Sequence, residues 1–211
     1  MAVLLLRLSA ALQSWGSDSR FDTRDTNREP TKSGVLGMVA AALGIKREDS
    51  QEKLTELNKL RFAVRVDREG KLLKDYHTAK SDESSYVTNR YYLADATFLV
   101  GLESDDRQLL EQIDSAMRNP VFAVFLGRRS CPPTLPVSMG LRDGELLSVL
   151  KSEPPLCESD RSTRIVFETG ENGVLIGDVP VSFSHKHRSY GYRMYKEEMI
   201  RKPEHDPMLE L

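Results

Sequence analysis

Residues 30–44, Pro-Thr-Lys-Ser-Gly-Val-Leu-Gly-Met-Val-Ala-Ala-Ala-Leu-Gly, form the stretch from which the fold can be predicted. Thr31 or Ser33 can cap the start of a helix, and Gly44 can adopt the left-handed conformation just past its end. No residue from Val35 to Leu43 is charged, so no face of this helix is suited to water. We therefore expect a helix that lies between a sheet and another part of the chain.

Two glycines, Gly34 and Gly37, lie on one face of this predicted helix. Each costs about 1 kcal/mol of helix propensity relative to alanine, so a close contact has to compensate. Gly34 falls in the first turn, where unpaired N–H groups can face an anion, and Gly37 lies one turn deeper. We expect Gly34 to face a bound phosphate and Gly37 to face a packed neighbour.

Basic residues recur at every fourth position on the way into this helix: Arg20, Arg24, Arg28 and Lys32. Several cations beside a helix N-terminus make a natural phosphate site. The alternative is a solvated loop, since four acidic residues balance these charges locally: Asp18, Asp22, Asp25 and Glu29. The sequence leaves both interpretations open.

The composition is that of a globular protein, with 39% hydrophobic and 29% charged residues in a chain of 211. The formal net charge is −2, so any binding of nucleic acid has to come from local basic patches. Cys131 and Cys157 form no C-x-x-C pattern, and residues 2–8 are too short an apolar run for an export signal. No run approaches the ~18 apolar residues of a membrane span, and we expect a cytoplasmic protein.

The order of predicted elements indicates an α+β, ferredoxin-like domain at residues 1–136. The elements are strands at 2–9, 62–66, 91–102 and 121–126, a helix from residue 31, a short helix at 50–60 and a helix capped by Ser104. The polar stretch 77–90 lacks periodicity and is expected to protrude as a loop or hairpin. Residues 137–211 predict a smaller β-rich C-terminal part, with strands at 164–168 and 174–184 joined by a hairpin turn at 170–173.

A Gly-Arg-Arg-Ser turn, Gly127 to Ser130, directly follows the strand predicted at 121–126. Glycine lets a ligand backbone approach, the adjacent guanidiniums of Arg128 and Arg129 offer bidentate phosphate contacts, and Ser130 adds a donor. A surface turn with two solvated arginines is the alternative.

Residues 184–196, Ser-His-Lys-His-Arg-Ser-Tyr-Gly-Tyr-Arg-Met-Tyr-Lys, combine cations with tyrosines and contain no acid. Aromatic faces stack bases while cations follow phosphates, so this pattern suits single-stranded nucleic acid, with Lys186 and Arg188 as candidates. An edge strand protected by charge would have the same pattern. His185 and His187 lack a third ligand, so no metal site is predicted.

Catalytic motifs are weak. Asp75-Tyr76-His77 is the one triplet suited to acid–base chemistry, and a hydrogen-bonded histidine at a strand end explains it equally. Lys32-Ser33 lacks the glycine spacing of a phosphate-binding loop, which argues against an NTPase, and no cofactor is expected.

Five motifs in matching order resemble the CasD family, the subunit of the type I-E CRISPR Cascade complex that holds the five-prime handle of the guide RNA. They are Leu6-Arg7-Leu8, Gln13-Ser14-Trp15-Gly16, the stretch from Glu29 to Gly37, Asp75-Tyr76-His77-Thr78 and the stretch from Leu126 to Pro132. The resemblance runs from the first strand to about residue 136 and is weaker beyond residue 140.

The resemblance implies a ferredoxin-like RAMP domain with a thumb at about residues 78–90. It also implies a non-catalytic role in antiviral defence, with the crRNA handle, a neighbouring backbone subunit and the large subunit as partners. A related protein of the type I-C subtype cuts precursor RNA, so a metal-independent endoribonuclease is the alternative. The candidate RNA-binding residues are Gln13, Trp15, Arg20, Arg24, Arg28, Lys32, Ser33, Gly34, Tyr76, His77, Arg90, Gly127, Arg128, Arg129, Ser130, Lys186 and Arg188.

Overall fold

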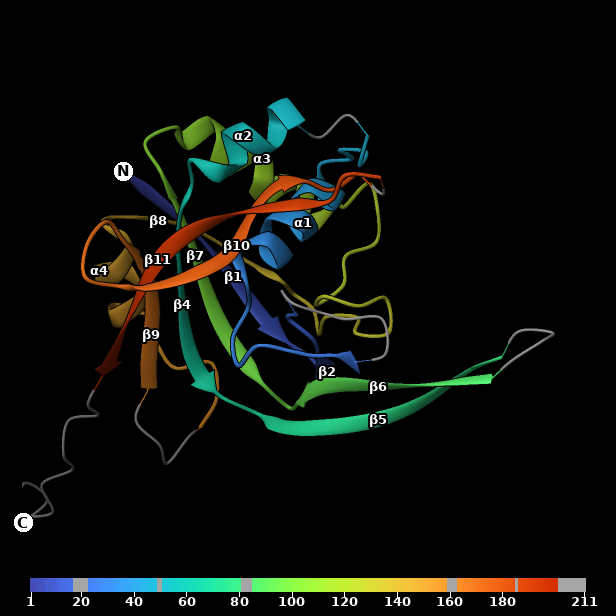
Figure 1. Ribbon diagram of the computed structural model, residues 1–211. Coiled ribbons are helices and arrows are strands. Elements are labelled where there is room, and N and C mark those ends of the chain that lie inside the picture. Colours follow the sequence, from blue (N-terminus) through green and yellow to red (C-terminus); the bar gives the residue numbers. More distant parts are fainter. Residues whose placement is uncertain (17–22, 49–50, 81–84, 159–162, 185, 201–211) are drawn as a thin grey trace, which may run out of the picture.

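Figure 1 shows the computed structural model, which describes residues 1–16, 23–48, 51–80, 85–158, 163–184 and 186–200. Its strands are β1 (Ala2–Ser9), β2 (Leu12–Gln13), β3 (Thr23–Arg24), β4 (Arg61–Arg68), β5 (Lys71–Lys80), β6 (Ser85–Ala94), β7 (Thr97–Ser104), β8 (Ser138–Asp143), β9 (Thr163–Thr169), β10 (Val174–Ser182) and β11 (Ser189–Ile200). Its helices are α1 (Lys32–Ala42), α2 (Gln51–Asn58), α3 (Arg107–Arg118) and α4 (Leu146–Ser152).

The main sheet has the strand order β10-β11-β9-β4-β7-β1-β8. Four of these strands, β4-β7-β1-β8, pair antiparallel, with α1 between β1 and β4 and α3 between β7 and β8. This is the ferredoxin-like arrangement, so the predicted fold is confirmed. Strands β9, β11 and β10 extend the same sheet beyond β4. The domain boundary expected at residue 136 falls just before β8.

Strand β1 lies at the centre of the molecule because both of its faces are apolar. Leu4, Leu6 and Leu8 pack into the cluster that α1, α2 and α3 cover. Val3 and Leu5 point the other way, into the cluster that α4 covers. A strand buried on both faces has no polar alternation, which explains the nearly continuous apolar run at the start of the chain.

Helix α1 has the boundaries and the surroundings that its sequence predicts. Thr31 is the N-cap, and its hydroxyl accepts a hydrogen bond from the N–H of Gly34. Gly44 follows the helix with a φ of +74°. The sheet covers one side of α1 and the β10–β11 hairpin crosses the other, as Figure 1 shows. A Cβ on Gly37 would lie 3.3 Å from the Phe183 ring, which confirms that this glycine faces a packed neighbour.

The strand predicted at 121–126 is wrong, since these residues are irregular and β8 is the fourth strand of the ferredoxin-like order. The N–H groups of Val121 and Phe122 donate to the carbonyls of Ala42 and Ala41 at the end of α1. Their backbone therefore caps a helix and is not available for a sheet.

The single strand predicted at 91–102 is divided between two sheets. Strand β6 belongs to a second sheet with β2, β3 and β5, whereas β7 belongs to the main sheet. The break falls at Asp95, which has a φ of +57° and donates its N–H to the Ala11 carbonyl. The helix cap was also assigned to the wrong residue, because Asp106, and not Ser104, accepts from the N–H of Leu109 at the start of α3.

Two predictions for the C-terminal part fail because of β11. Strands β9 and β10 have the predicted positions, but they are not joined as a hairpin, since β11 pairs with both and lies between them. For the same reason β11 is not an edge strand, so edge protection does not explain its cations and tyrosines.

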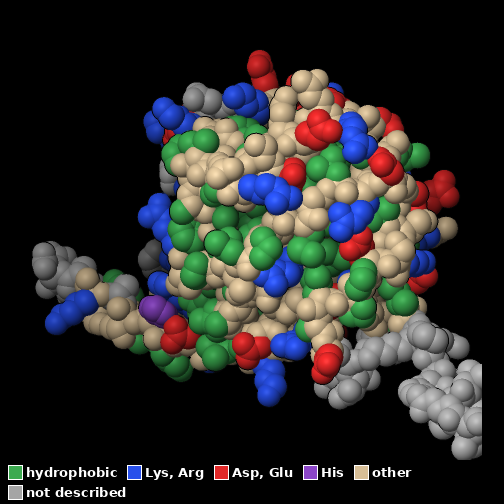
Figure 2. All heavy atoms as spheres, turned by 180° about the vertical axis from the view of Figure 1, so that it is seen from behind, with side chains coloured by type: hydrophobic (Ala, Val, Ile, Leu, Met, Phe, Trp, Pro, Cys, Tyr) green, Lys and Arg blue, Asp and Glu red, His purple; other side chains and the backbone are tan. Residues whose placement is uncertain are grey.

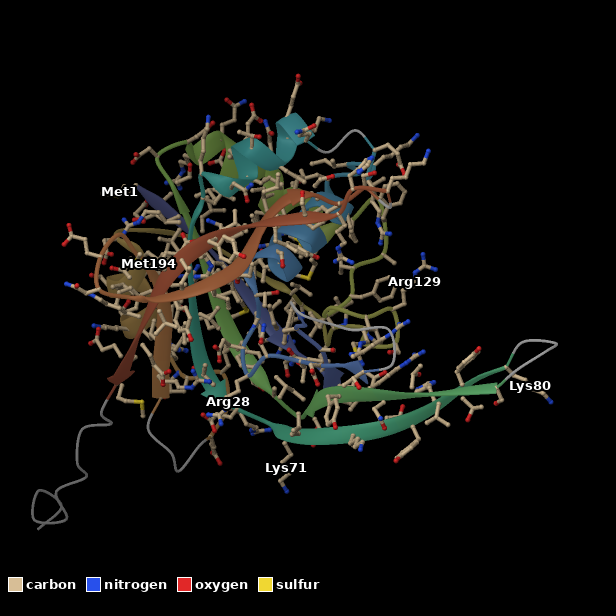
Figure 3. The ribbon with its side chains drawn as sticks, in the orientation of Figure 1. Met1, Arg28, Lys71, Lys80, Arg129 and Met194 are labelled. Atoms are coloured by element: carbon tan, nitrogen blue, oxygen red, sulfur yellow. The ribbon has the colours of Figure 1, made fainter. Side chains whose placement is uncertain are left out.

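Strands β5 and β6 form a long antiparallel hairpin that projects from the body of the protein (Figure 1). Figure 3 shows Lys71 beside the body and Lys80 near the far end of the hairpin. The polar stretch at 77–90 therefore protrudes, as its composition predicts; residues 81–84 lie outside the described part. A role as a thumb stays a prediction.

Candidate nucleic-acid interface

A hollow of about 610 Å³ opens where several segments that are distant in sequence meet, among them β3 with Arg24 and the following Asp25. Its lining comes from the segment after β2, the start of α1, the Gly-Arg-Arg turn and the segment before β11: Ser14, Trp15, Gly16, Arg24, Asp25, Thr31, Ser33, Gly34, Gly127, Arg128 and Arg188. Seven of these residues were candidates from sequence: Trp15, Arg24, Ser33, Gly34, Gly127, Arg128 and Arg188. Three arginines and one aspartate line the hollow, so its charge favours an anion.

The Gly-Arg-Arg turn is fixed by its glycine. Gly127 has a φ of +90°, and a Cβ on it would lie 1.6 Å from the backbone oxygen of Ser14. The turn is closed on both sides, because Leu126 N–H donates to the Cys131 carbonyl and Cys131 N–H donates to the Arg128 carbonyl. Only glycine lets this turn lie directly against the segment after β2.

Arg128 is held in place on two sides. Its guanidinium carbon lies 4.6 Å from the centroid of the Tyr92 ring, and its Nη2 donates to the Arg24 carbonyl at 2.8 Å. Arg128 therefore differs from the exposed Arg129 and Ser130, which project from the same turn. Tyr92 was missed as a site residue, and only its place beside the hairpin motif in the sequence could have suggested it.

Trp15 lines the hollow, and Gln13 lies behind it in the core. Gln13 is fully buried, its amide donates to the carbonyls of Leu8 and Ala96, and its oxygen accepts from the Trp15 indole. A direct RNA contact by Gln13 is not compatible with this burial. Trp15 is buried as well, although part of it lines the hollow.

The space that Gly34 leaves is filled by tryptophan. A Cβ on Gly34 would lie 2.8 Å from the Trp15 ring and 3.0 Å from the Thr31 hydroxyl. The close packing of Trp15 on α1 is therefore enough to require glycine at this position. Gly34 also lines the hollow, and its contact with a phosphate stays a prediction.

The N-terminus of α1 already has an anion, and it comes from the protein itself. The buried carboxylate of Asp178 accepts from the N–H of Lys32 at 2.8 Å and from two nitrogens of Arg193 at 2.6 and 2.8 Å. Arg193 also lies over the Phe62 ring. A carboxylate satisfies the helix dipole as a phosphate would, so the anion site predicted here is occupied from within.

Lys32 points away from the surface and cannot serve as a phosphate contact in this structure. Its ammonium group donates to the carbonyls of Asn58 and Leu60 and to the Glu168 carboxylate, with its side chain 5% exposed. The four-residue spacing of basic residues therefore does not produce one basic surface. Arg24 lines the hollow, Arg28 is exposed, and Arg20 lies outside the described residues.

The remaining candidates are spread over the surface. Figure 3 shows Arg28 near the end of β4 and well apart from Arg129. Lys186 is exposed just before β11, while Tyr76, His77 and Arg90 belong to the β5–β6 hairpin. His77 Nε2 lies 2.6 Å from the Asp75 carboxylate. Arg90 is opposite Asp75 on one side and Arg24 on the other, so it connects the hairpin with the hollow.

The rest of the surface carries no other dominant charge on the face that Figure 2 shows, where basic and acidic side chains are interspersed. Among the described residues, no three His, Cys, Asp or Glu side chains gather in a way that could hold a metal ion. Within the same residues, no helix has the length and apolar character needed to cross a membrane.

The ferredoxin-like arrangement of the main sheet is the fold of the RAMP class of proteins. The family model described as CRISPR-associated protein (Cas_Cas5) matches residues 3–196. The chain therefore belongs to the Cas5 family, and the resemblance to CasD drawn from the motifs is confirmed.

Individual relatives agree with this family. The CRISPR system Cascade subunit CasD of Escherichia coli strain K12 is 36% identical in an alignment of 156 positions that covers 65% of this chain and 70% of the relative. A solved structure described as a crystal structure of a Cas protein is 42% identical with a TM-score of 0.76, over 93% of this chain and 94% of that chain. A chain of a CRISPR RNA-guided surveillance complex is 32% identical with a TM-score of 0.77, over 93% of this chain and 89% of that chain.

Proposed function

We propose that this protein is a non-catalytic RNA-binding subunit of a type I-E CRISPR Cascade complex and that its hollow holds the five-prime handle of the crRNA. Similarity to CasD and to a chain of an RNA-guided surveillance complex supports membership in such a complex. The observation that carries the proposal is the convergence of Arg24, Arg128 and Arg188 in one hollow. These guanidiniums come from three distant segments, and their geometry suits the phosphates of a folded-back strand.

The projecting hairpin gives the protein a means of linking subunits. Its outward-facing residues include aromatic and aliphatic side chains that are largely exposed, among them Leu72, Tyr76, Tyr86 and Val87. Exposed apolar groups on a projecting element are typical of a contact with another protein. We propose that the hairpin contacts the neighbouring backbone subunit and that the large subunit docks beside the hollow, in a complex that works in the cytoplasm.

The geometry of the hairpin argues against the endoribonuclease alternative. Tyr76 and His77 are neighbours in β5, so their side chains point to opposite faces. Lys74 lies with Tyr76, 5.4 Å from its ring centroid, whereas His77 contacts Asp75. A tyrosine, a lysine and a histidine that acted together on one phosphodiester would have to share a face.

The double substitution Arg128→Ala and Arg129→Ala is expected to weaken binding of the cognate handle RNA at least tenfold, because a hydrogen bond to a charged group contributes about 1.5–3 kcal/mol. The dependence of affinity on salt should also become shallower, since fewer counterions are released. Fluorescence titrations at several salt concentrations measure both quantities. Lys151→Ala, which removes a cation paired with Glu198 away from the hollow, is the control.

Unchanged affinity and an unchanged salt slope would make both arginines ordinary solvated residues. The RNA recovered from these titrations should be intact. Specific cleavage that disappears in a His77→Ala variant would instead support the endoribonuclease alternative.

Replacing residues 78–87, the part of the hairpin beyond the His77–Thr88 pair, with a short Gly-Ser turn should leave the melting temperature nearly unchanged, because the described side chains there are exposed and the pairing of β6 with β3 is kept. Co-purification with the backbone subunit should be lost. The measurements are a melting curve of the isolated chain and a pull-down from cells that express all subunits. Normal assembly of the shortened protein would refute the linking role of the hairpin.

A further inference from the structure

Tyr92 occupies the junction between the projecting hairpin and the hollow. It lies near the inner end of β6, only 3% exposed, while the outer residues of the same strand form the hairpin. Its ring lies against the guanidinium of Arg128, with the guanidinium carbon 4.6 Å from the ring centroid. The hairpin and the Gly-Arg-Arg turn therefore meet at this one side chain.

The contact leaves part of the Arg128 guanidinium unused. Nη2 donates to the Arg24 carbonyl, whereas Nη1 is buried and has no hydrogen-bond partner within the described residues. Buried donors are almost always satisfied in folded proteins, so Nη1 is an unused donor of a residue that lines the hollow.

The contact with Arg128 also affects the pKa of the Tyr92 hydroxyl. Burial raises the pKa of its hydroxyl, but hydrogen bonding to Arg128 and Ser130 and the positive charge of Arg128 outweigh this effect, so the pKa lies below its ordinary value. Both the hydroxyl and the ring of Tyr92, on β6, thus interact with the guanidinium of Arg128.

From this arrangement we propose that Tyr92 is a positioning residue that holds Arg128 ready for an RNA phosphate in the hollow. The inference rests on the proposed function. A free arginine side chain loses rotamer entropy when a ligand immobilises it. A guanidinium that is already stacked and hydrogen-bonded has lost that freedom before the RNA arrives. Arg188 is held less firmly than Arg128. It is exposed, and its guanidinium carbon lies 5.4 Å from the centroid of the Tyr190 ring, farther than the 4.6 Å between Arg128 and Tyr92.

A double-mutant cycle on the full chain tests this role, with a synthetic RNA that carries the five-prime handle of the cognate repeat. Tyr92→Leu removes the ring and should weaken binding roughly fivefold, in line with the strength of a partly buried cation–π contact. In an Arg128→Ala background the same substitution should have no further effect. Tyr92→Phe keeps the ring and should bind more tightly than Tyr92→Leu.

Tyr91 provides the matched control, since it is the neighbour of Tyr92 in β6, points to the other face and lies near Lys74. Tyr91→Leu should bind the RNA as the wild type does. An ultraviolet titration of the tyrosines gives a second measurement that does not depend on the folding of Tyr92→Leu. In Arg128→Ala the pKa of the Tyr92 hydroxyl should be higher than in the wild type, because burial remains while the hydrogen bond and the positive charge of Arg128 are lost.

The outcomes separate this inference from the proposed function. Unchanged binding in Arg128→Ala would contradict the use of the hollow for RNA. Weaker binding in Arg128→Ala together with unchanged binding in Tyr92→Leu would overturn the role of Tyr92. An equal loss from Tyr92→Leu in both backgrounds would show a general structural effect and would also overturn it, as would an unchanged tyrosine titration in Arg128→Ala.

Discussion

Asp178→Ala should lower the free energy of unfolding by about 3–5 kcal/mol, because removal of one partner leaves buried charge without compensation. Asp178 is fully buried and accepts three hydrogen bonds, one from the Lys32 N–H and two from Arg193. The substitution would leave the Arg193 guanidinium, whose side chain is 10% exposed, with only the more distant Glu168 carboxylate at 3.7 Å. Denaturant unfolding of the isolated chain measures the change.

Two variants serve as controls for this prediction. Asp178→Asn keeps the shape and can still accept from Lys32, so it should be less destabilised than Asp178→Ala. Asp143→Ala removes a carboxylate from an exposed pair with Arg107 and should change stability little. If Asp178→Ala unfolded at the same denaturant concentration as the wild type, the buried network would not hold the β10–β11 hairpin on α1.

Gly127→Ala is the second substitution for which we expect a large effect, about 3 kcal/mol or more in the free energy of unfolding, from backbone strain together with overpacking. The added methyl group would lie 1.6 Å from the Ser14 backbone oxygen, and the φ of +90° is unfavourable for alanine. The turn can relieve this contact only by moving away from the segment after β2. Arg128 would then lose its contact with Tyr92 and its place in the hollow. Gly127→Ala should therefore bind handle RNA no more tightly than the Arg128→Ala/Arg129→Ala double variant does.

Gly170→Ala is the matched control, because a Cβ at that position meets nothing within 4 Å. Its melting temperature and RNA affinity should equal those of the wild type. Melting curves and titrations of both variants decide the question. A Gly127→Ala protein with normal stability and normal affinity would mean that the turn does not need its close approach to Ser14.

Elements with a strong local pattern could be predicted from sequence. The structure buries the apolar run of β1 and the uncharged stretch of α1, as their patterns indicate. It also buries Leu110, Ile113 and Met117, which share one face of α3. Strand β8 could not be predicted, because Ser138 to Asp143 alternate weakly and become a strand only by pairing with β1. In the same way, the break at Asp95 is decided by which sheet each half of the segment joins.

The sequence predicted several residues of the candidate site individually, but not that they converge. Arg24, Arg128 and Arg188 were each suggested by their neighbours in sequence, but only long-range packing brings them to one hollow, including that of the Gly-Arg-Arg turn on Ser14. Gln13 and Lys32 have polar side chains whose partners lie far away in the chain, so sequence placed them at the surface although they are buried. Tyr92 was missed because its partner Arg128 is distant in sequence.

The start of α1 separates what the sequence alone determines from what depends on tertiary structure. The sequence by itself determined that a helix begins near Thr31 or Ser33 and that its first N–H groups favour a negative partner, since capping and the helix dipole are local properties. The structure selects Thr31 as the N-cap. Which partner satisfies them depended on long-range packing. The β10–β11 hairpin folds across α1 and brings Asp178, 146 residues away from Lys32, to the end of the helix. Because a carboxylate and a phosphate cannot occupy the same donors, we place the proposed phosphate contacts in the neighbouring hollow and not at the end of α1.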